Sequence, residues 1–430
     1  MSLPGDASLS LDQAPPLSIP ASFFLLAPVA IAAAGVLLLV LGVDPLESGG
    51  RPGSGALTHL GTLGLLGSVM LGALYQMIPV VLGGAVPAIR VAHAVHAAWT
   101  LGVTALVAGF LTGPGGLWGI GGSLLGAALV LFLVPVGLAM ARASAQTATR
   151  VGMGFAVVGL LVVGLLGLSF VALRGAGWLP PGYHPTTWRI GHLGLGLAVW
   201  VGGLLTAVSW QVLPMFYLST EIRPAARTAV TAAVGLSLLG VPIALGLGGS
   251  IELVLALLAP AGVAIWAAHP ALMIPALRAR RRKRQDESLT AWFGALVCAP
   301  ATGLCAVAAI AWPSPRWDVA FVLLAVLGWG GLALHGMLCR VLPFLVWFHR
   351  LSPWIGKVKV PSMRKLLPQD RIRRGVLAHG VALGLLLLAA GTGSDFLARI
   401  GGLALLVTGV LLGANLVSVL RVRAPESVSP

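Results

Sequence analysis

Long apolar segments recur along the whole chain and are separated by short polar breaks. Twelve of these segments are long enough for an α-helix to cross the hydrocarbon core of a bilayer, which takes about 20 residues. Only two breaks are long, and both are basic: residues 278–288 (RARRRKRQDES) and residues 349–374. The predicted spans are 19–43, 54–83, 88–112, 116–142, 150–174, 188–218, 224–248, 250–274, 290–312, 317–347, 374–393 and 395–420.

The composition supports this interpretation. Apolar residues make up 58% of the chain, charged residues only 9%, and the mean hydropathy is +0.98. A soluble domain has about 25% charged residues. We therefore predict an all-α polytopic membrane protein, in which residues 19–420 form a single transmembrane domain and residues 1–18 and 421–430 form tails.

The distribution of Lys and Arg predicts the orientation. If the N-terminus is cytoplasmic, 22 of the 27 basic residues fall on the cytoplasmic side and five fall outside. The five are Arg51, Arg174, Arg189, Arg316 and Arg399. We expect a bacterial inner-membrane protein with both termini inside. Its net charge of +15 then reflects basic loops beside anionic lipid and not a nucleic-acid partner.

Three of the spans end alike. Span 2 begins near His59 and ends in Gln76–Pro79, and span 6 begins near His192 and ends in Gln211–Pro214. Span 10 ends in Arg340–Pro343 without a histidine at its start. A polar-x-x-Pro ending on every fourth span indicates an internal repeat. We predict three four-helix units around a pseudo-threefold axis.

The chain resembles subunit I of the heme-copper oxidases and nitric oxide reductases. It shares with them twelve spans, both termini inside, a pseudo-threefold repeat and a histidine near the outer end of span 2. The NnrS-type heme proteins are another similar group. The resemblance implies a b-type heme, an electron donor or a small gas (NO or O2) as partner, and a divergent oxidoreductase. It places His59 at the position of the low-spin heme ligand.

The chain departs from this family at the copper site. Span 6 lacks the family's His-Pro-Glu-Val-Tyr, span 7 has no histidine, and span 10 has His335 alone where the family has His-x-His. We therefore expect a divergent member that lacks the copper-site histidines.

Distances along the helices predict which histidines share a heme. His59 lies 17 residues before Gln76, and His192 lies 19 residues before Gln211. At about 1.5 Å per residue, the two histidines differ by roughly 3 Å in depth. His335 lies only five residues before Arg340, about 18 Å deeper than His59. We predict His59 and His192 as heme ligands; the alternative is hydrogen bonding at the membrane interface.

A second group of candidate ligands lies toward the inner side. Histidine, thioether and thiol groups together suit copper(I) or heme, although packing is the alternative for each of them. The candidate metal ligands are His93, His96, His335, Met337, Cys339 and His379. The remaining histidines, His184, His269 and His349, are predicted in or beside loops and are given no role.

All twelve Asp and Glu residues are predicted in loops, tails or first helical turns. Proton-coupled transporters usually carry buried carboxylates in the membrane, so their absence argues against a proton-driven porter. Two alternatives to a heme protein remain. One is a transporter for copper or a small solute, and the other is a cofactor-free subunit that keeps the fold and docks a partner subunit or forms a homo-oligomer.

Overall fold

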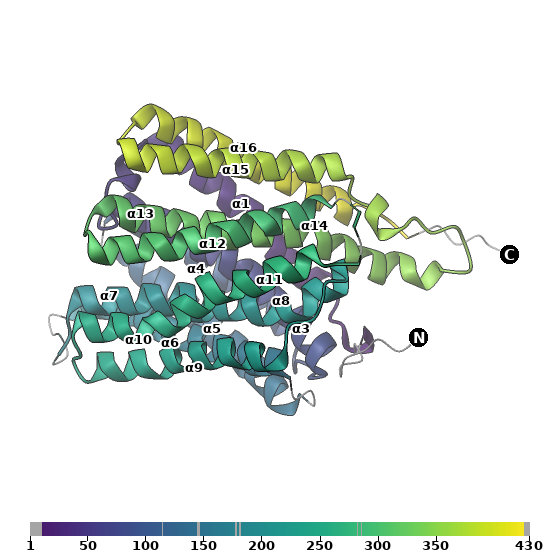
Figure 1. Cartoon of the computed structure of the whole chain (residues 1–430), viewed down its shortest axis with the longest axis horizontal. Helices are drawn as coiled ribbons and strands as arrows, with labels where there is room; N and C mark the ends of the chain where they lie inside the picture. Colours follow the sequence, from purple (N-terminus) through teal and green to yellow (C-terminus); the bar gives the residue numbers. More distant parts are fainter. Residues whose placement is uncertain are drawn as a thin grey trace. The chain divides into compact units, whose positions relative to one another are not determined.

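The computed structural model describes residues 11–113, 115–143, 147–176, 179, 182–281, 283–284 and 286–424. In this part of the chain every regular element is helical, and twelve helices are long and apolar enough to cross a membrane (Figure 1). The predicted all-α membrane class is therefore confirmed. Residues 1–10 and 425–430 of the predicted tails lie outside the described residues.

The twelve helices match the predicted spans in order and nearly in length. The largest difference is at span 10, which has 40 residues and ends at Trp354 and not at residue 347. Spans 1 to 12 are Ser18–Leu41, Pro52–Leu82, Val91–Thr112, Gly116–Arg142, Ala148–Leu173, Pro185–Tyr217, Pro224–Gly246, Ile251–Arg278, Glu287–Ala311, Pro315–Trp354, Gln369–Thr392 and Asp395–Leu420.

Eight spans are single α-helices and four are interrupted by π-helical segments. The single helices are α1 (Ser18–Leu41), α4 (Val91–Thr112), α5 (Gly116–Arg142), α6 (Ala148–Ala176), α9 (Pro224–Gly246), α12 (Glu287–Ala311), α15 (Gln369–Thr392) and α16 (Asp395–Leu420). Span 2 comprises α2 (Pro52–His59), η3 (Leu60–Gly67) and α3 (Ser68–Leu82); span 6 comprises α7 (Pro185–Gly194), η4 (Leu195–Val201) and α8 (Gly202–Tyr217); span 8 comprises α10 (Ile251–Val263), η5 (Ala264–Ala268) and α11 (His269–Arg278). Span 10 comprises α13 (Pro315–Leu323), η6 (Leu324–Gly331), α14 (Leu332–Val346), η7 (Trp347–Leu351) and the short turn η8 (Ser352–Trp354).

Spans 2, 6 and 10 are the buried spans. In their most apolar stretches 89%, 78% and 78% of the residues are buried, whereas no other span exceeds 50%. The other spans expose large aliphatic side chains such as Val130, Leu239 and Leu304, as lipid-facing helices do, since lipid tails are as apolar as these residues. The three spans that share the polar-x-x-Pro ending are thus also the interior spans.

A π-helical segment begins at the same position in each of these three spans. Leu60, Leu195 and Leu324 each lie 16 residues before the polar residue of the shared ending, which is Gln76, Gln211 or Arg340. The segments η3, η4 and η6 are seven or eight residues long, whereas most π-helical segments are single turns. The repeat seen in the sequence therefore extends to the backbone conformation of the three interior spans.

The described chain divides into two compact units. Unit 1 comprises Met1–Pro15, Ala73–Arg284 and Ala299–Trp312, and unit 2 comprises Pro16–Gly72, Gln285–Cys298 and Pro313–Pro430. Within unit 1, α4 packs on α5, α6 on α8, and α9 on α10. Within unit 2, α16 packs on both α1 and α15, and η3 packs on η6.

Glycine permits the close approach of α1 and α16 in unit 2. A Cβ atom on Gly35 of α1 would lie 2.5 Å from the backbone nitrogen of Leu406 and 2.6 Å from the carbonyl oxygen of Gly402. Both neighbours are backbone atoms of α16, which cannot move aside as a flexible side chain can. Membrane helices use small residues in this way to bring their backbones together.

We expect Gly35→Ala to lower the stability of the protein by about 1–3 kcal/mol, the usual cost of overpacking. The matched control is Gly384→Ala on α15, where no atom lies within 4 Å of an added Cβ. That change should be neutral or stabilising by up to about 1 kcal/mol, because alanine favours the helix. Unfolding of both variants in detergent measures the difference, and equal stability would contradict the close backbone contact.

Candidate functional site

His59 is the last residue of α2 in unit 2 and is half-buried. Its Nδ1 lies 2.8 Å from the carbonyl oxygen of Gly55, one turn earlier on the same helix. A carbonyl oxygen only accepts hydrogen bonds, so Nδ1 carries the proton and Nε2 presents a lone pair. Metal-ligating histidines are usually oriented by such a bond from their second ring nitrogen. The local geometry of His59 therefore suits an axial heme ligand.

His192 lies in unit 1, near the end of α7 and three residues before η4. It is half-buried, and its ring meets the edge of Phe170 at a centroid distance of 5.6 Å. A Cβ on Gly167 would lie 3.2 Å from its Cε1 atom. The imidazole ring of His192 on α7 is thus packed against Phe170 and Gly167 of α6. Since His59 belongs to unit 2 and His192 to unit 1, their pairing on one heme stays a prediction.

Two of the candidate metal ligands meet in unit 2. His335 on α14 and His379 on α15 are almost completely buried, and their Nδ1 atoms are 3.2 Å apart. The Nε2 of His379 lies 3.1 Å from the carbonyl oxygen of Leu327, in the π-helical segment η6. His379 must donate to this carbonyl, so its Nδ1 accepts, and the Nδ1 of His335 carries the proton between them. The pair therefore links α15 to both α14 and η6.

This assignment of protons leaves the Nε2 of His335 as a buried acceptor, and no hydrogen-bond partner is present for it. The backbone of α15 closes that edge of the ring, because a Cβ on Gly375 would lie 3.0 Å from Nε2. A metal ion or heme iron has no room there. On the other ring, a Cβ on Gly331 would lie 3.3 Å from the Nε2 of His379. The geometry thus favours a helix–helix contact for this pair over a metal site.

The other predicted ligands do not join this pair. Cys339 is one turn from His335 and lines a separate small pocket, and Met337 is half-buried. His93 and His96 lie on α4 in unit 1, and His93 is exposed. Among the described residues, no three His, Cys, Asp or Glu side chains come together in a way that could hold a metal ion.

His269 was given no role by the sequence because it was predicted beside a loop. In the structure it begins α11 within span 8, nine residues before the end of the span, and it is fully buried. Its Nε2 lies 2.9 Å from the hydroxyl of Ser209, which itself donates to the carbonyl of Thr206. The ring also meets Trp210 at 5.1 Å. The position of His269 inside the 250–274 segment was the signal that could have indicated its burial.

Two close contacts in unit 2 leave little space between spans 2 and 10. Spans 2 and 10, which hold the heme ligands in the resembling family, touch directly here: Gly61 abuts Val326, and a Cβ on Gly330 would lie 3.1 Å from the side chain of Leu66. The orientation of the His59 ring suits a heme ligand. The packed surface between spans 2 and 10, in contrast, has no space for a heme. A heme held by both His59 and His335 would require spans 2 and 10 to separate at this surface.

Comparison with known proteins finds no family model that matches the chain and no curated protein with significant similarity to it. The resemblance to the heme-copper oxidases therefore depends on the residues and helices described above.

We expect the buried histidine pair to contribute to stability. Replacing either His335 or His379 with leucine leaves a polar group of the other without its partner, which costs about 1–3 kcal/mol. The double variant should lose less than the sum of the two single variants, with a coupling of about 0.5–3 kcal/mol. Unfolding of the four proteins in detergent gives this coupling.

His93→Leu is the matched control, because it removes an exposed histidine from α4. It should leave stability within about 0.5 kcal/mol of the original protein. Additive effects of His335→Leu and His379→Leu would mean that the two rings do not interact.

Proposed function

We propose that the protein is a heme-binding integral membrane protein, related in architecture to subunit I of the heme-copper oxidases, that transfers electrons or handles a small redox gas such as NO or O2. In this proposal His59 would hold the heme iron. The observation that supports it is the hydrogen bond from the Nδ1 of His59 to the carbonyl oxygen of Gly55, which orients the ring and makes Nε2 the nitrogen that would bind iron.

The position of His59 within the fold also supports this role. It lies on the most buried of the twelve spans and directly before the π-helical segment η3. π-Helical segments are rare, and the single-turn ones frequently occur at functional sites. His192 lies at the corresponding end of span 6, three residues before η4, and is our candidate for the second ligand.

The number of histidines that bind the iron distinguishes electron transfer from the handling of NO or O2. A bound heme supplies a one-electron redox centre. If His59 and His192 both held the iron, the heme would serve electron transfer. If His59 held it alone, the heme could bind NO or O2. In either case we propose no copper centre, because span 7 (Pro224–Gly246) contains no histidine.

We also propose that the chain consists of three four-helix units, oriented with both termini and the basic loops in the cytoplasm. The equal placement of the π-helical segments in spans 2, 6 and 10 supports the repeat. The excess of Lys and Arg on one side supports the orientation.

A cofactor-free membrane subunit is the second candidate. The direct packing of Gly61 on Val326 and of Leu66 on Gly330 favours it, because these contacts occupy the space between spans 2 and 10. Copper transport is less well supported, since the ring of His335 is closed by Gly375 and the predicted copper ligands are not gathered in one place.

The heme proposal predicts a Soret band and an α band in the reduced-minus-oxidised spectrum of the purified protein. His59→Ala should abolish these bands or reduce heme content at least about tenfold, because the iron loses the ligand that orients it. His184→Ala is the matched control, since His184 is exposed at the start of α7. It should leave the spectrum unchanged.

The remaining variants separate the alternatives. His192→Ala should yield a five-coordinate spectrum if His192 is the second ligand, and an unchanged spectrum if His59 binds alone. His335→Ala should leave the spectrum intact. A protein that lacks heme after expression with heme precursor, while remaining folded, would refute the heme proposal and favour the cofactor-free subunit.

A further inference from the structure

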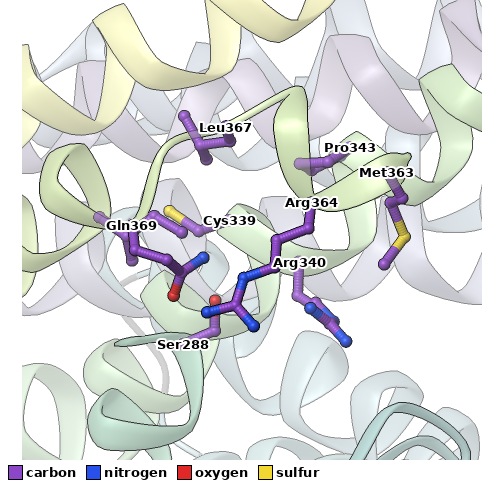
Figure 2. Close-up of a pocket in the computed structure, with 9 residues that line it drawn as sticks. Ser288, Cys339, Arg340, Pro343, Met363, Arg364, Leu367 and Gln369 are labelled. Carbon is purple, nitrogen blue, oxygen red and sulfur yellow. The ribbon is translucent and has the colours of Figure 1, made fainter. Parts of the chain in front are cut away.

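A small pocket lies in unit 2 beneath the loop that joins span 10 to span 11 (Figure 2). The space inside it, counting the open solvent at its mouth, is about 240 Å³. Its polar lining comes from four parts of the chain: Ser288 on α12, Arg340 on α14, Arg364 in the loop and Gln369 at the start of α15.

The lining contains several hydrogen-bond donors. Figure 2 shows the guanidinium group of Arg364 extending between Gln369 and Ser288, with Arg340 beside it. The amide oxygen of Gln369 accepts from the backbone N–H of Glu287 at 2.9 Å, so its NH2 group can donate elsewhere. The hydroxyl of Ser288 is buried, with only 1% of the residue exposed, and has no hydrogen-bond partner. A buried hydroxyl of this kind requires an explanation, such as a bound ion or group.

Two long helices begin at this pocket. Ser288 is the second residue of α12, and Gln369 is the first residue of α15. The N-terminus of a helix carries a partial positive charge and favours anions. The backbone N–H groups that open α12 already bond to Gln369 and Asp286. The helix ends therefore add positive potential, and the donors for a phosphate group come from side chains, above all the two guanidinium groups.

Two carboxylates near the pocket offset the charge of its two guanidinium groups. Asp286 accepts a hydrogen bond from Arg340 at 3.1 Å and caps the backbone N–H of Ser288 at 3.1 Å, and Glu287 is buried beside it. Neither carboxylate lines the pocket. Exposed cations of the loop and of the first turns of α15 outnumber the one exposed carboxylate there, Asp370; they are Lys357, Lys359, Lys365, Arg371, Arg373 and Arg374. The surrounding field is therefore positive.

The loop over the pocket begins near the level expected for lipid headgroups. The helix α16 has 26 residues, which is about 39 Å at 1.5 Å per residue and close to the 40–45 Å of a whole bilayer with its headgroups. Arg350 donates to the carbonyl oxygens of Leu420 and Val422 at 2.6 Å, at the end of this helix. The loop that follows Arg350 and covers the pocket therefore begins at the level of the headgroups.

We propose that this pocket binds a phosphate group, held by Arg364, the hydroxyl of Ser288 and the NH2 group of Gln369. The group comes from the headgroup of an anionic phospholipid or from a phosphate-bearing solute. This site is independent of the heme proposal and uses none of its residues.

The first experiment measures lipid retention. The full-length protein is purified from nanodiscs that contain phosphatidylglycerol and phosphatidylcholine, and bound lipid is measured by native mass spectrometry. Arg364→Gln and Ser288→Ala should each weaken retention of phosphatidylglycerol, Arg364→Gln by about tenfold, because a hydrogen bond to a charged group contributes about 1.5–3 kcal/mol. Arg364→Lys should retain more binding than Arg364→Gln.

The matched control is Lys357→Gln, which removes an exposed cation from the same loop outside the pocket. It should leave retention within about twofold. An equal loss in Lys357→Gln and Arg364→Gln would overturn the proposal, because binding would then reflect the general charge of the surface. Thermal unfolding of each variant in phosphatidylcholine alone shows that the fold is intact.

The second experiment distinguishes the source of the phosphate. In nanodiscs of phosphatidylcholine alone, inorganic phosphate should raise the unfolding temperature of the original protein but not of Arg364→Gln if the ligand is a solute. Phosphatidylglycerol should have this effect if the ligand is a lipid. If neither phosphatidylglycerol nor phosphate binds in an Arg364-dependent way, the pocket is not a phosphate site.

Discussion

The absence of water from the bilayer core is the constraint on which this structure depends. A polar group in hydrocarbon has to find its partner inside the protein. The interior spans 2, 6 and 10 accordingly contain buried polar side chains, and on spans 6 and 10 several of these are paired across helices. His335 pairs with His379, Arg340 pairs with Asp286, and on span 6 Ser209 pairs with the His269 of span 8. Each pair links two helices that are distant in the sequence.

The sequence predicted the twelve spans well because hydrophobic length is a property of each segment alone. The ends of span 10 were harder, since the helix continues through the aromatic and basic residues Trp347–Leu351 as a π-helical segment. Such a continuation depends on local hydrogen bonding that hydropathy does not reveal. The contact between His335 and His379 was also not predictable as a pair, because it requires α14 and α15 to be adjacent at a particular register.

Some residues were misjudged because burial depends on neighbouring helices. His269 was predicted beside a loop, although it is fully buried against Ser209 and Trp210 of α8. Asp286 and Glu287 were correctly predicted in a loop or a first helical turn, but both are buried at the start of α12. Asp286 is stabilised there by Arg340, the polar residue of the third shared ending. The sequence identified Arg340 as part of a repeat but could not identify its partner.

The π-helical segments have a consequence for comparing this protein with distant relatives. A turn of π-helix contains about one residue more than a turn of α-helix, since its hydrogen bonds join residues five apart and not four. Each added residue rotates the helix that follows by about 100° at 3.6 residues per turn. An alignment that pairs Leu60–Gly67 without a gap against an ordinary α-helix would therefore assign the residues of Ser68–Leu82 to the wrong face. Gaps of a single residue belong within η3, η4 and η6, where an alignment that treats every membrane helix as regular would never place them.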